Sequence, residues 1–125
     1  MIPLTIKDNL KLSDVKDEFS SIFPYLKIEF FKHKHAEYKS NAKSDMFSSD
    51  LTFKKARRKH NEGVIVVKEN MSVFDLEKLF QDVFGIAAQV FRKSGRSWIE
   101  TSVTDDWSLK RQNDEGKELS SLAGQ

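Results

Sequence analysis

The chain has 125 residues, of which 38% are hydrophobic and 32% charged, a composition that predicts one globular domain and lies outside the range of disordered chains. It contains no cysteine, so disulfides, thiolate catalysis and every cysteine-containing zinc or iron–sulfur site are excluded. The net charge of +2 conceals a segregation, because residues 32–60 carry nine Lys and Arg against three Asp and Glu.

Residues 1–31 predict a β-α-β unit. Residues 2–7 alternate as a strand does, and apolar residues then recur at helical spacing from Leu12 to Phe23. Pro24 cannot continue that helix, and a half-buried strand follows from Leu26 to Phe31. The N-terminus has no basic region that leads into a long apolar run, so we expect a soluble cytoplasmic protein with no membrane contact.

Residues 32–62 predict a basic insertion, which at this length is either mobile or functional. Ser, Asn, Lys and Asp dominate residues 39–50, a composition typical of a loop. Asp50 is placed to cap a short basic helix over residues 51–60, although that segment contains few apolar side chains.

Residues 63–92 predict a second β-α-β unit. Val64–Val67 is apolar on both faces, as in a central strand, and Val73–Phe84 carries a wide apolar stripe at helical spacing. Ser72 is placed to cap this helix and Gly85 to end it. A strand that alternates through Ala88 and Val90 completes the unit.

Residues 93–119 predict an added strand and an added helix. A hairpin turn leads into a strand over residues 97–101. Thr104 is expected to cap the last helix, with Asp105 and Asp106 in its first turn, where carboxylates favour the positive helix end. We expect Gly116 to end or interrupt this helix.

The two β-α-β units repeat each other at an offset of 61 residues. Identical or similar residues recur at eleven of the nineteen positions from Ile6 to Pro24, which is the trace that a duplicated supersecondary unit leaves. The identical pairs are Lys7/Lys68, Asn9/Asn70, Asp14/Asp75, Phe19/Phe80 and Phe23/Phe84.

This duplication predicts one domain over residues 1–125, an α+β fold of the ferredoxin-like, split β-α-β type. In that arrangement the first strand of each unit lies in the middle of one antiparallel sheet, and both helices cover one face. The added strand is expected beside residues 88–92, and residues 120–125 are expected to fray. Such a fold hosts many functions and assigns none.

The three histidines all lie in the basic segment. His33 and His35 share one face of an extended strand, and together with His60 they are the candidate ligands for a metal ion. The competing interpretation is accidental placement in a Lys-rich segment, and we expect neither a metal nor another cofactor.

The basic run near residue 56 is the candidate for nucleic-acid contact, because its cations can neutralise phosphates. The predicted central strands carry no aromatic residue of the kind that RNA-binding sheets use for base stacking. A solvated basic loop is the alternative. The candidate contacts are Lys54, Lys55, Arg57, Arg58 and Lys59.

Two tryptophans fall in the predicted extension. Trp98, on the edge strand, is a candidate contact with a partner, and Trp107 is the expected anchor of the last helix. Asp105 and Asp106 are interpreted as capping residues. No nucleophile with a neighbouring base and no phosphate-binding glycine motif is visible, so we expect no enzyme.

These features predict a non-catalytic interaction module that binds a protein partner or a second copy through the edge strand or the segment Lys32–His60. The first alternative is a nucleic-acid-binding domain that uses Lys32–His60. The second is a small-molecule-binding protein or enzyme with a pocket near Trp107.

Overall fold

A computed structural model of the chain describes residues 2–33 and 43–123, the last two by their backbone alone. The elements in chain order are β1 (Ile2–Ile6), α1 (Leu12–Ile22), β2 (Leu26–Phe31), the 3-10 turn η1 (Lys43–Asp45), α2 (Phe53–Ala56), β3 (Gly63–Val67), α3 (Val73–Asp82), β4 (Ala87–Ser94), β5 (Ser97–Glu100) and α4 (Leu109–Ala123). Within these described ranges, no helix is long and apolar enough to cross a membrane.

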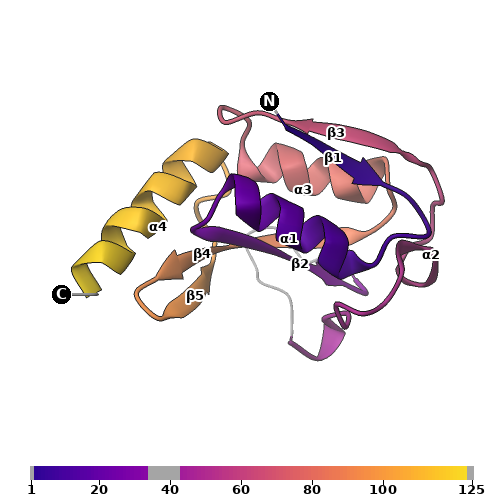
Figure 1. Ribbon diagram of the computed structural model, residues 1–125, viewed down its shortest axis with the longest axis horizontal. Coiled ribbons are helices and arrows are strands. Elements are labelled where there is room, and N and C mark those ends of the chain that lie inside the picture. Colours follow the sequence, from indigo (N-terminus) through magenta and orange to yellow (C-terminus); the bar gives the residue numbers. More distant parts are fainter. Residues whose placement is uncertain (1, 34–42, 124–125) are drawn as a thin grey trace.

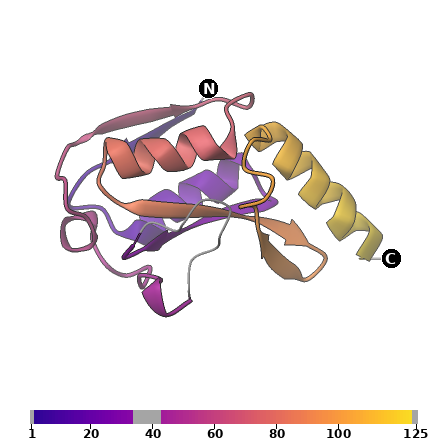
Figure 2. The ribbon, with the colours of Figure 1, turned by 180° about the vertical axis from the view of Figure 1, so that it is seen from behind.

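The strands form two antiparallel sheets that face each other across the core. β1 pairs with β3, and β2, β4 and β5 form the second sheet in that order. Figures 1 and 2 show α1 along one side of the space between the sheets and α3 along the opposite side. The fold is therefore α+β, as predicted.

The ferredoxin-like arrangement is not confirmed. β1 and β3 are antiparallel neighbours, as that arrangement requires, and β5 lies beside β4 as expected. However, β2 pairs with β4 and not with β3, and α1 and α3 do not cover the same face of one sheet. The physical reason is that alternation along a strand shows which face is buried but not which strand is its neighbour.

The register of both sheets relates the two halves by an approximate twofold axis. Leu4 lies opposite Ile65, and Ile28 lies opposite Val90. These partners are 61 and 62 residues apart, so Leu4 faces its own counterpart in the other half, and Ile28 faces the residue next to its counterpart, Gln89. Such pairing arises where a twofold axis passes between two equivalent antiparallel strands.

The same symmetry extends into the segment that the sequence marks as an insertion. The first helical N–H groups of α1, at Leu12 and Ser13, donate to the carbonyls of Leu51 and Ser49 at 2.8 and 3.0 Å. Those of α3, at Val73 and Phe74, donate in the same way to Trp107 and Asp105 at 3.1 and 2.8 Å. Residues 49–55 therefore occupy the place in the first half that residues 105–111 occupy in the second.

Both halves also start a further helix at this point. Thr52 caps α2 by accepting a hydrogen bond from the N–H of Lys55, and Ser108 accepts one from the N–H of Arg111 at the start of α4. The local sequences agree as well, since Asp-Leu-Thr-Phe-Lys-Lys in the first half corresponds to Asp-Trp-Ser-Leu-Lys-Arg in the second. The repeating unit thus includes α2 and α4.

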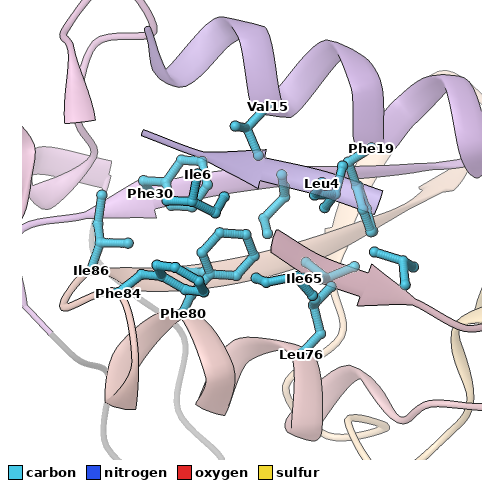
Figure 3. Close-up of a cluster of buried hydrophobic side chains, with 14 of the residues drawn as sticks. Leu4, Ile6, Val15, Phe19, Phe30, Ile65, Leu76, Phe80, Phe84 and Ile86 are labelled. Carbon is cyan, nitrogen blue, oxygen red and sulfur yellow. The ribbon is translucent and has the colours of Figure 1, made fainter. Parts of the chain in front are cut away.

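The core is rich in phenylalanine and lies between the sheets and the two flanking helices (Figure 3). Phe30 on β2 meets Phe80 on α3 edge to face, with ring centroids 5.2 Å apart, and meets Phe53 of α2 at 5.6 Å. Edge-to-face packing places the positive ring edge against the negative ring face, which stabilises such pairs beyond the area they bury. Phe53 therefore ties α2 to the core that both halves share.

The last helix differs from its predicted form at both positions that the sequence emphasised. It begins at Leu109, so Asp105 and Asp106 lie in the preceding turn and Thr104 does not cap it. It also continues through Gly116, where α4 packs very closely on Tyr25 and on β4. A Cβ at Gly116 would lie 2.9 Å from Cβ of Tyr25, so glycine serves close approach rather than helix termination.

Candidate functional site

Arg57, one of the predicted nucleic-acid contacts, is buried in an ion pair. Its side chain is fully inaccessible, its Nε donates to Oδ1 of Asp8 at 2.9 Å, and its Nη2 lies 2.8 Å from the same oxygen. Nη1 donates to the carbonyl of Asn61 at 2.5 Å. Arg57 is therefore unavailable to a phosphate, and the prediction for this residue is corrected.

The residues around Arg57 close the C-terminal end of α3. Nζ of Lys59 donates to the carbonyl of Asp82 at 2.7 Å, and Nδ2 of Asn61 donates to that of Val83 at 2.9 Å. The N–H of Arg58 donates to the carbonyl of Gly85 at 3.2 Å. A helix leaves its last carbonyls without partners and carries partial negative charge there, so cations at this place are favourable.

The basic run is therefore partly a structural clamp. Arg57 and Lys59 contact α3 or the loop behind it, whereas Lys54, Lys55 and Arg58 are exposed and form no side-chain ion pair within the described residues. Nothing in the sequence indicated that Asp8 and Asn61 are the partners of Arg57. Asp8 lies 49 residues before Arg57, in the turn after β1, and no local pattern links the two. This clamp is one reason for the excess of positive charge between residues 32 and 60.

The Asp8 carboxylate also contacts the imidazole of His60, whose Nδ1 lies 2.9 Å from Oδ2. Burial opposes ionisation of Asp8, but the hydrogen bonds and positive charges of His60 and Arg57 outweigh it and hold the pKa of this carboxyl below its ordinary value. The Asp8 side chain keeps 25% of its surface exposed, so solvent screens this cluster.

We expect the Asp8→Asn variant to be less stable than wild type at neutral pH, with a difference that vanishes in acid. Because folding lowers the Asp8 pKa, its stabilisation is complete above the unfolded-state pKa of about 3.9 and disappears as pH falls through the lower folded-state value. Urea unfolding of both proteins from pH 7 to pH 2.5 measures this. Asp17→Asn, at an exposed position of α1, is the control, and a pH-independent difference for Asp8→Asn would contradict the linkage.

The histidines do not come together in the described part of the chain. Nδ1 of His33 lies 2.9 Å from Oδ2 of Asp45, whereas His60 contacts Asp8. His35 lies outside the described residues. Within residues 2–33 and 43–123, no three or more His, Asp or Glu side chains are grouped to hold a metal ion.

Trp98 lies on β5, which is an edge of the three-stranded sheet and is exposed at all four of its residues. Trp98 and Ile99 each keep 37% of their surface accessible, on opposite faces of the strand. Nζ of Lys27 lies 5.3 Å from the Trp98 ring centroid and 5.3 Å from that of Phe91. This aromatic pair and its cation form one face of the sheet at the edge.

Within the described residues, the backbone of β5 has hydrogen-bonding positions that β4 does not use. Thr101 donates its N–H to the carbonyl of Val90 at 3.3 Å, and Arg92 lies opposite Ile99. Hydrogen-bonded and non-hydrogen-bonded pairs alternate in an antiparallel ladder, so the N–H and C=O groups of Trp98 and Glu100 point away from β4. The open edge is therefore formed by these two residues.

Trp107 is partly buried, and its ring is engaged by two arginines. The guanidinium carbon of Arg111 lies 3.7 Å from the ring centroid, and that of Arg92 lies 5.5 Å away. The Trp107 carbonyl accepts the N–H of Val73. These contacts fit the predicted anchoring role of Trp107. A shallow depression lies elsewhere, on the outer side of α3, and Trp107 does not line it; its lining residues are Asp75, Lys78, Leu79, Asp82 and Val83.

Comparison of the chain with protein-family models, with curated proteins and with solved structures gave no match.

Proposed function

We propose that this protein is a non-catalytic interaction module that receives an extended segment of another protein as an additional strand along β5. The observation that carries the proposal is the exposed edge at Trp98 and Glu100, where backbone groups point away from the sheet. Strand addition uses those groups for affinity and alternate side chains for specificity. Trp98 and Ile99 supply apolar surface on the two faces of the site, and an exposed tryptophan is a common interface anchor.

The position of β5 supports this use of the edge. The β4–β5 hairpin extends beyond the two-stranded sheet, α1 and α3 in Figures 1 and 2, with α4 alongside it, and within the described residues no strand pairs with the outer edge of β5. β5 is only four residues long and carries Glu100, and short, charged edges resist indiscriminate pairing. The edge is thus protected from aggregation while its backbone stays accessible to a matching segment.

The test uses the acetylated, amidated peptide Thr-Val-Thr-Val-Thr-Val-Thr and the full chain. We expect slower hydrogen exchange at the amides of Trp98 and Glu100 when peptide is added, since these donors would gain partners. Glu100→Pro removes one outward N–H and should abolish the protection, whereas Glu100→Ala removes the same side chain and should retain it. Unchanged exchange at both amides at millimolar peptide would refute the proposal.

Nucleic-acid binding is the second candidate, supported by the exposure of Lys54, Lys55 and Arg58. Its electrostatic surface is smaller than the sequence predicts, because Arg57 is buried and Lys59 contacts the end of α3. Fewer phosphate contacts mean weaker and less salt-dependent affinity. The backbone edge at β5 has no role in such binding, so strand addition accounts for more of the structure.

A further inference from the structure

Resting on the proposed function of β5, we propose that the segment this edge receives is acidic. Lys93 lies directly opposite Trp98 in the β4–β5 pairing, and Arg96 follows in the exposed turn. Lys27 approaches the same tryptophan from β2. Two cations therefore lie beside the aromatic residue at the centre of the open edge, with Arg96 in the adjoining turn, and Glu100 is the one acid of β5.

Two of these cations have their charge available. Within residues 2–33 and 43–123, no acidic side chain forms an ion pair with Lys93 or Arg96. Lys27 is different, because its Nζ lies 3.6 Å from Oε2 of Glu29. An added strand would lie about 10 Å from β4, with β5 between them, so its carboxylates would be attracted by the charges of Lys93 and Arg96 without lying directly beside Lys93. A basic strand would be repelled.

The same charges disfavour the other occupants of this edge. A second copy of the chain that paired through its own β5 would bring another Lys93 and Arg96 toward the site and add like charge to like charge. A nucleic acid would satisfy the cations and stack on Trp98, but it would leave the outward backbone groups of Trp98 and Glu100 without partners. An acidic extended peptide uses the cations, the aromatic surface and the backbone together.

The decisive experiment compares three peptides of one length on the full chain by fluorescence anisotropy. They alternate valine with threonine, glutamate or lysine. At low ionic strength we expect the acidic peptide to bind at least about tenfold more tightly than the basic one, with the neutral one between them and the spread shrinking as salt is added. Equal affinities would overturn the acidic preference and leave strand addition standing.

Charge reversal at the site supplies the matched control. Lys93→Glu with Arg96→Glu should invert the order of the acidic and basic peptides. Lys54→Glu with Lys55→Glu makes the same change in net charge at two exposed positions of α2 and should leave the order unchanged. If both double variants change the order equally, the preference belongs to the net charge of the molecule, and the proposal fails.

Three further outcomes would overturn both the acidic preference and strand addition. The first is no binding of any peptide. The second is tight binding of a twenty-residue oligothymidylate that the Lys93→Glu/Arg96→Glu variant loses while no peptide binds. The third is a concentration-dependent dimer, seen by sedimentation, that Glu100→Pro dissociates and that peptides do not displace.

Discussion

Replacement of Arg57 by methionine is expected to lower the free energy of unfolding by about 2 to 4 kcal/mol, the range for losing a buried, multiply bonded charge. Methionine retains much of the aliphatic volume but removes every donor. The change leaves the Asp8 carboxylate without one of its two partners and the Asn61 carbonyl without its donor. It also removes one of the contacts between the end of α2 and the loop that follows α3.

Urea unfolding followed by tryptophan fluorescence measures this effect. The matched control is Lys54→Met, which removes one positive charge from exposed α2 and should change stability by less than about 0.5 kcal/mol. Arg57→Lys separates charge from geometry, since an ammonium group cannot reproduce the planar fork and should recover only part of the loss. Equal unfolding midpoints for Arg57→Met and Lys54→Met would show that the buried pair contributes nothing.

The Gly85→Ala variant is expected to lower the free energy of unfolding by about 2 to 4 kcal/mol. Strain in the left-handed backbone should contribute about 1 to 2 kcal/mol of this loss, and steric overlap of the new methyl group a similar amount. Gly85 has φ of +68°, a left-handed conformation that alanine adopts only with strain. A Cβ at this position would lie 2.6 Å from the backbone nitrogen of Lys59. Neither chain segment can yield easily, because the Arg58 N–H donates to the Gly85 carbonyl.

Gly95→Ala is the control that separates the two causes. Gly95 has a similar φ of +64° but lies in the β4–β5 turn, so only the backbone term should apply. Chemical unfolding of the two variants at one pH provides the comparison. If Gly85→Ala is no more destabilised than Gly95→Ala, the close approach of the Lys59 backbone is not a determinant of stability.

Together the Arg57→Met and Gly85→Ala variants test whether the basic segment is part of the folded body. Arg57 and Lys59 join α2 and its following loop to the end of α3, and Phe53 places α2 against Phe30 of the core. A loop that merely carried charge would tolerate both substitutions. The expected losses would therefore assign much of the charge segregation to folding rather than to a ligand.

Much of the local structure was predictable from residue patterns. The apolar stripe of α3 predicted its extent, Ser72 accepts a hydrogen bond from the N–H of Asp75 at 3.0 Å as a cap, and Gly85 adopts the positive φ expected after a helix. Helical periodicity likewise placed α1, which ends before Pro24. These features depend on neighbours within one helical turn, and that is why the chain reveals them directly.

The candidate site was only half predictable. Trp98 was expected on an edge strand, and β5 lies at an edge. Its surrounding cations come from β2, β4 and the turn, and only the strand order brings Lys27 to Trp98. The role of Arg57 had no local signal at all, because its acceptors lie at Asp8 and Asn61 on different segments.

The sequence by itself determined α1, α3, the order of the strands and the 61-residue repeat, because each follows from periodicity along the chain. It did not determine the extent of α2, which is four residues long, or the burial of β3, whose Val64 and Val66 are exposed although the strand was predicted to be central. Only the tertiary structure decided that β2 joins β4 and that residues 49–55 match residues 105–111. It also placed Lys59 of the basic run at the C-terminal end of α3 and β5 at an open edge of its sheet. Such outcomes depend on which buried face meets which, and alternation within a strand carries no information about its partner.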